Sequence, residues 1–206
     1  MAPDGLQSPQ ILTSMNLGDH LPKELEPMIF LDYDGTLTPI VANPDQAYLS
    51  ESMREVVRSV AQDFPVAIIS GRERQDVQQL VGLEEIYYAG SHGYDIAGPA
   101  DIALEPKGAR ELIPKLQSLY DHLQDQLSSF EGVRLELKRY SLAIHYRKLQ
   151  QDLITFLHLK VEAALEAFHG LRLNGGKKVL DIQPAIQWDK GQAMLWLMRQ
   201  VEESGP

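Results

Sequence analysis

The sequence contains no cysteine among its 206 residues. This excludes disulfide bonds, cysteine-ligated zinc, cysteine nucleophiles and thiol redox chemistry. No apolar run approaches the ~20 residues that a membrane-spanning helix needs, and the first residues lack the basic-then-apolar pattern of a signal peptide. We therefore expect a cytoplasmic protein that does not act in a membrane.

Positive charge is also scarce, since 19 Lys and Arg stand against 29 Asp and Glu and leave a net charge of −10. This balance argues against nucleic-acid binding. The charge is unevenly spread: residues 107–178 hold 12 Lys and Arg and 8 Asp and Glu, and the rest holds 7 and 21. Ordinary surface variation and two modules with different roles both explain the difference.

The first part of the chain has the pattern of an α/β protein. Residues 1–24 show no sustained periodicity and are expected to form a flexible tail. Buried strands are predicted by three short apolar runs, at residues 28–31, 66–69 and 86–89. Helices are predicted between these runs, at residues 50–64 and 73–81. This alternation predicts a parallel sheet.

The pattern changes near residue 98. Two helices are predicted, at residues 109–127 and 152–168, and alternating segments at 133–138 and 141–147 predict a hairpin. Two further strand segments, 171–173 and 179–182, flank Asn174-Gly175, a pair that favours a hairpin turn. Another amphipathic helix then begins after residue 188. We therefore expect a core of residues 25–98 and 185–206, with an inserted α+β cap domain of residues 99–184.

Two acidic residues, Asp32 and Asp34, follow the first predicted strand, and Gly35 allows the chain to turn there. Ligands of parallel sheets bind at the carboxyl ends of the strands, and adjacent carboxylates repel each other unless a cation lies near. Mg²⁺ suits such oxygen ligands, while one carboxylate can act as nucleophile and the other as general acid and base. An Asx turn also explains an Asp-Gly pair.

The string at residues 30–38 resembles the first motif of the haloacid dehalogenase superfamily, hydrophobic-D-x-D-G-T-L. The resemblance implies a Rossmannoid core, with Asp32 as nucleophile and Asp34 as general acid and base. It also implies that Mg²⁺ binds the Asp32 carboxylate and the Asp34 backbone carbonyl. Ser70 and Lys190 match the second and third motifs, whose side chains bind the phosphoryl group. Taken alone, Ser70 is typical of a helix cap and Lys190 of a solvated lysine.

Further strings resemble the trehalose-6-phosphate phosphatase family, in the family's order and over about residues 28–203. They are Ile-Ser-Gly-Arg at 69–72, Gly-Ser-His-Gly at 90–93, Glu-x-Lys at 136–138, Tyr-Ser-Leu-Ala-Ile-His-Tyr-Arg at 140–147, Lys-Val-Leu-Asp-Ile-Gln-Pro at 178–184 and Trp-Asp-Lys-Gly at 188–191. The resemblance implies Mg²⁺-dependent hydrolysis of trehalose 6-phosphate to trehalose and phosphate, through an aspartyl-phosphate, beneath a cap that closes over the sugar.

The substrate contacts implied by this resemblance are Arg72, His92, Glu136, Lys138, His145, Arg147 and Asp181. The family usually has Glu at the position of Asp181, so a contact there is one methylene shorter. Without the resemblance, His145 and Arg147 also fit an exposed strand face. Glu136 and Lys138 also fit a surface ion pair that contributes under ~1 kcal/mol to stability.

The family's fourth motif, Gly-Asp-Asp followed by Thr-Asp-Glu, is absent from the sequence after Lys190. Its carboxylates complete the Mg²⁺ shell in the family. A fragment of a longer enzyme and a natural short form without activity both explain the absence. We expect the first, because all the earlier motifs are intact.

Two other functions remain open at this stage. One is a different sugar phosphatase of the same superfamily, acting on sucrose phosphate, glucosylglycerol phosphate or mannosylphosphoglycerate. The other is a non-catalytic sugar-phosphate-binding domain that is fused to, or docked on, a glycosyltransferase partner. The absent fourth motif favours the binding domain, and the intact first motif argues against it.

Overall fold

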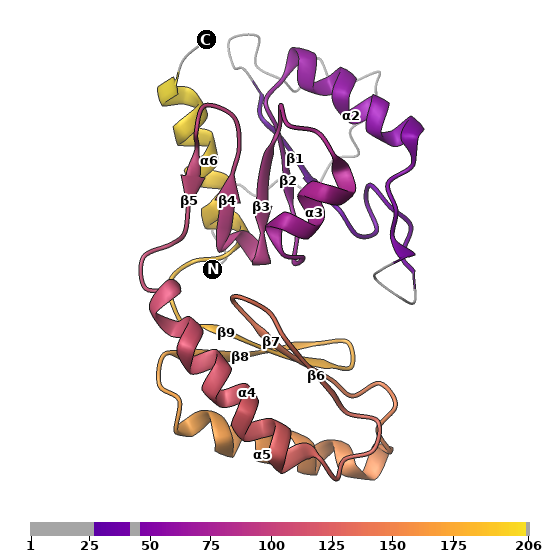
Figure 1. The fold of residues 1–206 in the computed structure, drawn as a ribbon, viewed down its shortest axis with the longest axis vertical. Coiled ribbons are helices and arrows are strands. Elements are labelled where there is room, and N and C mark those ends of the chain that lie inside the picture. The colour runs from indigo at the N-terminus through magenta and orange to yellow at the C-terminus, as the bar shows by residue number, and fades with distance from the viewer. Residues whose placement is uncertain (1–26, 42–45, 205–206) are drawn as a thin grey trace, which may run out of the picture.

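The computed structural model describes residues 27–41 and 46–204, so the expected tail of residues 1–24 lies outside the described residues. Two sheets form separate parts of the molecule (Figure 1). The first sheet has five strands in the order β1-β2-β3-β4-β5, and the second has four in the order β6-β7-β9-β8. Among the described residues, no helix combines the length and the apolar character needed to cross a membrane.

The first sheet contains β1 (Ile29–Asp32), β2 (Val66–Ile69), β3 (Tyr87–Gly90), β4 (Asp95–Ala97) and β5 (Ala103–Leu104). The first three strands are parallel and are joined through α2 (Glu51–Asp63) and α3 (Arg74–Val81), as the alternation predicts. The last two strands are antiparallel and were not predicted. The sheet is therefore mixed, and its parallel half comes from the apolar runs.

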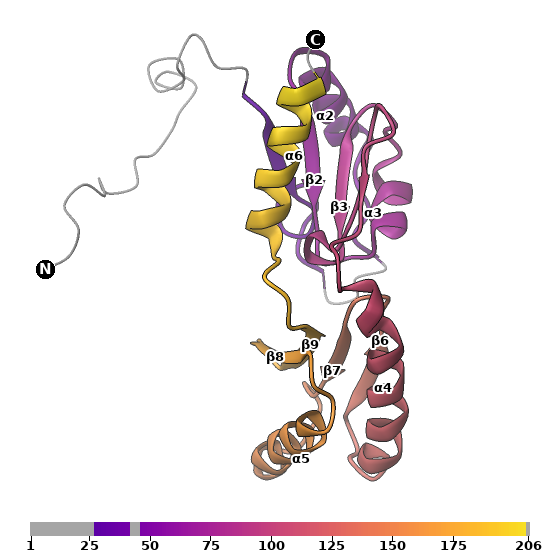
Figure 2. The same cartoon turned by 90° about the vertical axis from the view of Figure 1, so that its left-hand side faces the viewer.

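Helices cover both faces of the first sheet. Figure 2 shows α2 and α3 on one side and α6 (Lys190–Ser204) on the other. Because both faces are covered, all four residues of β2 are buried. Val77 of α3 packs with Ile68 on one face, and Leu197 of α6 packs with Ile69 on the other. This three-layer arrangement leaves the carboxyl ends of the strands open to the rest of the molecule.

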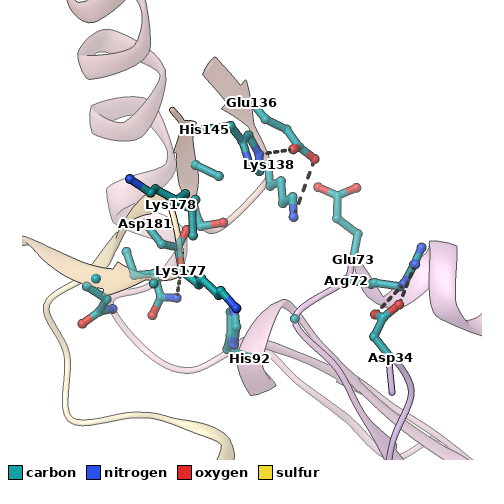
Figure 3. A pocket seen from close by; sticks show the side chains of 18 of the residues that line it. Asp34, Arg72, Glu73, His92, Glu136, Lys138, His145, Lys177, Lys178 and Asp181 are labelled. Atoms are coloured by element: carbon teal, nitrogen blue, oxygen red, sulfur yellow. Dashed lines mark hydrogen bonds and ion pairs between the residues drawn. The ribbon is translucent and has the colours of Figure 1, made fainter. Parts of the chain in front are cut away.

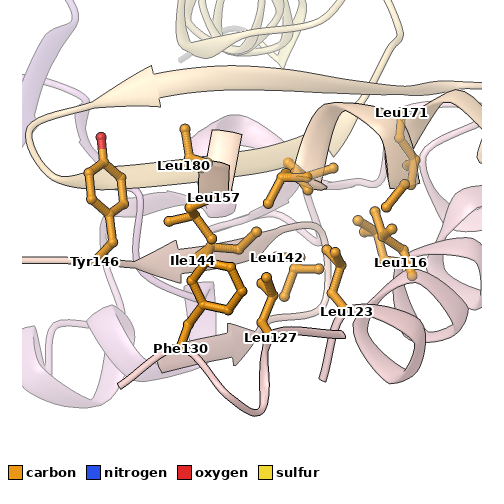
Figure 4. Close-up of a cluster of buried hydrophobic side chains, with 14 of the residues drawn as sticks. Leu116, Leu123, Leu127, Phe130, Leu142, Ile144, Tyr146, Leu157, Leu171 and Leu180 are labelled. Atoms are coloured by element: carbon orange, nitrogen blue, oxygen red, sulfur yellow. The ribbon is translucent and has the colours of Figure 1, made fainter. Parts of the chain in front are cut away.

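The second sheet contains β6 (Arg134–Leu137), β7 (Leu142–His145), β8 (Leu171–Gly176) and β9 (Val179–Pro184). Its apolar face packs against α4 (Ile113–Leu127) and α5 (Ile154–Glu166). Figure 4 shows this packing, with Leu157 beside Ile144 and Leu116 beside Leu171. Strand side chains alternate between faces, so the residues between these apolar positions face away from the helices.

The predicted turn at Asn174-Gly175 is wrong. Both residues belong to β8 and pair with Asp181 and Leu180 of β9. The chain turns three residues later, at Lys177 and Lys178, where Lys178 adopts a left-handed conformation with φ of 65°. The polar Asn174 is therefore a strand residue opposite Asp181, which places it on the same face of the sheet.

The predicted boundary at residue 98 is also wrong. Strand β5 pairs with β4 in the first sheet, so the cap that was expected at residues 99–184 begins after Leu104. The chain passes out of the first sheet through residues 105–109 and returns to α6 through residues 185–189. We call residues 110–184 the second module and the remainder of the described chain the core.

Candidate functional site

Asp32 and Lys190 meet at the carboxyl end of β1. The Nζ atom of Lys190, the first residue of α6, lies 3.0 Å from Oδ1 of Asp32. The Lys190 side chain is 39% exposed and the Asp32 side chain is 48% exposed, so the pair is open to a ligand. The two residues lie 158 positions apart in the sequence, and the fold brings them together because α6 begins beside the end of β1.

Asp34 faces Arg72. The chain turns after Asp32, with the Tyr33 ring buried and Gly35 at φ of 83°. The Arg72 Nε and Nη2 atoms donate to the two oxygens of Asp34, at 2.9 and 2.8 Å. The adjacent Asp34 carboxylate raises the pKa of the Arg72 guanidinium. Such a bidentate pair is strong and fixes the direction of the Asp34 carboxylate.

Ser70 and His92 follow the next two strands. Ile69 pairs with Asp32 across β1 and β2, so Ser70 lies beside the end of β1. The Ser70 hydroxyl is buried and accepts a hydrogen bond from the Arg72 N–H at 3.1 Å. Nε2 of His92 lies 3.9 Å from Oδ2 of Asp181, which connects the core to the second module. Burial lowers the pKa of His92, and nearby Lys190 adds to this lowering although Asp181 opposes it.

The polar face of the second sheet carries most of the other predicted contacts. Glu136 pairs with Ala143 in the strand register, Ala143 pairs with Asp181, and Asp181 pairs with Asn174. Because paired residues point to the same face, these four side chains form one row across the sheet. All four line the same cavity.

Glu136 is the centre of a charged cluster on this face (Figure 3). Its carboxylate lies 2.8 Å from Nε2 of His145, 3.6 Å from Nζ of Lys138 and 3.2 Å from Nη2 of Arg134. Burial opposes ionisation of Glu136, but the Lys138 and His145 side chains outweigh it and hold the pKa of Glu136 below its usual value. The cluster therefore presents an ionised carboxylate and a cation side by side.

A cavity of about 1410 Å³ lies between the core and the second module. The second module contributes six Lys and Arg and two carboxylates to its lining: Arg134, Lys138, Arg147, Arg172, Lys177, Lys178, Glu136 and Asp181. The core contributes two Lys and Arg and four carboxylates: Arg72, Lys190, Asp34, Glu73, Asp76 and Asp189. A cavity with a basic wall and an acidic wall suits an anion bound beside a cation.

The predicted site residues divide into two groups in the structure. Those that line the cavity are Asp34, Arg72, His92, Glu136, Lys138, His145, Arg147, Asp181 and Lys190. Asp32 and Ser70 lie at the neighbouring strand ends and do not line it. Arg147 is exposed at the end of the second sheet, beyond β7.

Sequence reasoning missed several lining residues: Glu73, Ser141, Arg172, Asn174, Lys177, Lys178 and Gln183. The alternation of β9 could have found Gln183, because it lies two residues after Asp181 and therefore faces the same way. Its Nε2 donates to Oδ2 of Asp181. The residues of β8 were missed because the turn was placed too early.

The described residues contain no group of three or more His, Asp or Glu arranged to hold a metal ion. Two groups suited to Mg²⁺ are nevertheless available. The Asp32 carboxylate is half exposed. The bridge between Asp34 and Thr38 uses the carbonyls of Tyr33 and Thr38, so the Asp34 carbonyl takes no part in those hydrogen bonds. One carboxylate and one carbonyl fit an ion that retains several waters and a phosphate.

Comparisons with known structures agree on the fold. A crystal structure of a trehalose-6-phosphate phosphatase related protein has a TM-score of 0.72 and 23% identity, covering 83% of this chain and 73% of that one. The C-terminal domain of the C. albicans trehalose-6-phosphate phosphatase has a TM-score of 0.64 and 24% identity, covering 82% and 61%. A haloacid dehalogenase-like hydrolase from B. subtilis has a TM-score of 0.52 and 16% identity, covering 86% and 79%. The expected haloacid-dehalogenase-like α/β fold is confirmed.

Sequence comparisons identify the family. Probable trehalose-phosphate phosphatase 3 of Oryza sativa subsp. japonica is 42% identical over 197 residues, which cover 89% of this chain and 54% of the relative. A trehalose-phosphate phosphatase of Mycobacterium bovis is 38% identical over 199 residues, which cover 97% and 50%. The chain thus spans about half the length of the curated relatives it matches. The trehalose-phosphatase family model matches residues 30–206, so the chain belongs to the trehalose-phosphatase family.

Proposed function

We propose that the protein hydrolyses trehalose 6-phosphate to trehalose and phosphate. The observation that carries this proposal is the contact between Asp32 and Lys190 at the end of β1, opposite the polar face of the second sheet. A nucleophile beside a cation suits phosphoryl transfer. Family membership and the names of the relatives support the choice of substrate.

In the first step an Asp32 oxygen attacks phosphorus, and the bond between phosphorus and the sugar oxygen breaks. Asp34 gives a proton to that leaving oxygen. In the second step water attacks phosphorus, its proton passes to Asp34, and the bond to Asp32 breaks. Lys190 neutralises charge on the phosphoryl group, and the Ser70 hydroxyl donates to one of its oxygens. Proton transfer requires Asp34 to leave its pair with Arg72.

Mg²⁺ would be held by the Asp32 carboxylate and the Asp34 carbonyl, where it would neutralise the negative charge of the phosphate. Opposite the phosphate, the sugar hydroxyls would meet donors and acceptors of the second module. The residues proposed for this contact are Glu136, Lys138, His145, Arg147 and Asp181, with Arg72 and His92 from the core. A cytoplasmic location is also part of the proposal.

Phosphate release from trehalose 6-phosphate with Mg²⁺ tests the proposal. We expect Asp32→Asn to reduce release to the background rate, because an amide oxygen is a poor nucleophile. Asp63→Asn is a matched control on an exposed helix position of the core and should leave the rate unchanged. Equal rates for Asp32→Asn and the parent would show that Asp32 is not the nucleophile. A panel of sucrose, glucosylglycerol and mannosylglycerate phosphates tests the choice of sugar.

A second function is favoured by one observation, the lack of a three-ligand metal cluster among the described residues. The protein would then bind a sugar phosphate without turnover, as a partner of a glycosyltransferase. Calorimetry separates the two functions. Binding of trehalose 6-phosphate without phosphate release and without dependence on Mg²⁺ would support the binding role.

A further inference from the structure

The turn between β6 and β7 carries two cavity residues at its base. The N–H of Lys138 donates to the carbonyl of Ser141 at 2.8 Å, which leaves Arg139 and Tyr140 as the two residues at the tip. Both Lys138 and Ser141 line the cavity. The position of the tip therefore determines the position of the Lys138 backbone, from which its side chain extends.

This tip is docked on three separate segments of the core. Glu73, after β2, accepts a hydrogen bond from the Arg139 N–H at 2.9 Å. Glu105, after β5, accepts one from Nη2 of Arg139 at 2.6 Å. The Tyr140 ring is fully buried and stacks on Tyr94, with ring centroids 5.8 Å apart.

Glu73 does not have the local role that its position suggests. It is the N-cap residue of α3, where a side chain often accepts from the first turn of its own helix. Its side chain makes no such capping hydrogen bond. The carboxylate instead accepts from the backbone of the second module, so removal of Glu73 should affect the docked turn more than the helix.

Glu105 lies at the junction, where its side chain is 29% exposed and the side chain of Arg139 is 43% exposed. The Oε2 atom of Glu105 and the Tyr140 hydroxyl are both buried. Burial raises the pKa of Tyr140, and the neighbouring Glu105 adds to this. The contact between Glu105 and Arg139 is a charge-assisted hydrogen bond, which is stronger than one between neutral groups and joins the tip to the core.

We propose that Glu73 and Glu105 are positioning residues of the substrate site, which hold the tip of the β6–β7 turn on the core and thereby place Lys138 at the cavity. The inference rests on the proposed function, in which Lys138 contacts the sugar phosphate. Misplacement of a binding group by about 1 Å is enough to lose much of its effect. Glu105 does not line the cavity, whereas Glu73 does, so the Glu105 variant separates positioning from direct contact with the substrate.

Titration calorimetry with trehalose 6-phosphate and with inorganic phosphate tests the proposal. We expect Glu73→Ala and Glu105→Ala each to weaken binding of trehalose 6-phosphate about tenfold, the usual effect of losing a hydrogen bond to a charged group. Binding of inorganic phosphate, which needs only the core, should stay the same. Glu73→Gln keeps an accepting oxygen and should restore binding of the sugar phosphate. Glu162→Ala, at an exposed position of α5, is the matched control.

Hydrogen exchange of the amides in residues 134–145 gives a second measurement. The Arg139 amide should exchange faster in Glu73→Ala than in the parent or in Glu73→Gln. Unchanged affinity for trehalose 6-phosphate in both alanine variants would overturn the positioning role. If the parent binds no trehalose 6-phosphate, the proposed function fails. Hydrogen exchange then tests separately whether Glu73 holds the turn on the core. Faster exchange of the Arg139 amide in Glu73→Ala supports this contact, and unchanged exchange overturns it.

Discussion

At the scale of single residues, Glu136 provides a direct test of the charged cluster. Arg134, Lys138 and the His145 ring surround its carboxylate, and they hold its pKa below the ordinary value of 4.5 against the opposing effect of burial. A folded-state pKa that is lower than the unfolded one stabilises the fold at higher pH, and this stabilisation is lost as pH falls through the folded value. The cluster should therefore make stability fall in acid.

We expect Glu136→Gln to lose less stability than the parent when pH falls from about 6 to about 3. The difference should stay under ~1 kcal/mol, because the Glu136 side chain is 35% exposed and its ion pairs are screened by water. Denaturant unfolding at both pH values measures it. Glu162→Gln is the control on an exposed helix face. An identical loss in Glu136→Gln and the parent would contradict a lowered pKa.

The residues of the first motif could be predicted because their chemistry is local in the sequence. Asp32, Asp34 and Gly35 lie within four positions and follow one apolar run. The pair between Asp34 and Arg72 could not be predicted from spacing, because it joins the ends of two strands. Arg72 matched a family motif as a substrate contact. In the structure Arg72 also pairs with two carboxylates, Asp34, which lies 38 positions earlier, and Asp76.

At the scale of secondary-structure elements, β3 passes very close to the start of α3. A Cβ atom on Gly90 would lie 2.2 Å from the backbone nitrogen of Arg74 and 2.4 Å from its Cα. Backbone atoms cannot move aside as a flexible side chain can. The contact between the strand and the helix therefore needs a residue without a side chain at position 90.

We expect Gly90→Ala to destabilise the fold by about 1–3 kcal/mol or more, the usual cost of overpacking. Gly175→Ala is the matched control, because a Cβ at that strand position meets no atom within 4 Å. Its effect should stay within about 0.5 kcal/mol. Urea unfolding of the two variants gives the comparison. Equal stability of the two would contradict the close approach.

Elements with one strong signal were predicted well, and those with competing signals were not. Strands β1, β2 and β3 could be predicted because a short apolar run is enough to indicate a strand that is buried on both faces. Asn174-Gly175 is a favourable turn pair, but the apolar residues of β9 pair with β8 beyond it, and this pairing overrides the local preference. Strand β5 has two residues, too few to show any period, so the boundary of the core was placed too early.

At the scale of the whole molecule, the core and the second module have separate apolar interiors. The interior of the second module holds 15 buried residues. None of them belongs to the clusters on the two faces of the first sheet. The cluster at the junction has only three buried residues, Tyr94, Ala109 and Tyr140. Little apolar surface therefore couples the unfolding of the two parts.

A mutation in one interior should consequently unfold that part first. Leu123→Ala removes a fully buried side chain of α4, which costs about 2–5 kcal/mol. Of the two tryptophans of the chain, Trp196 packs on the core, and Trp188 packs both on the core and on the junction cluster. We expect circular dichroism of Leu123→Ala to show an early loss of helix in urea, at concentrations where tryptophan fluorescence still reports a folded core.

Leu83→Ala, in the interior of the core, is the matched deletion and should move the fluorescence transition to lower urea. Coincident transitions by both measurements in Leu123→Ala would mean that the junction couples the two parts into one cooperative unit. The hydrogen bonds of Glu73 and Glu105 to Arg139 would then be the first contacts to remove, because they join the parts where apolar contact is small. Separation of the transitions in the triple variant with Glu73→Ala and Glu105→Ala would assign the coupling to that turn.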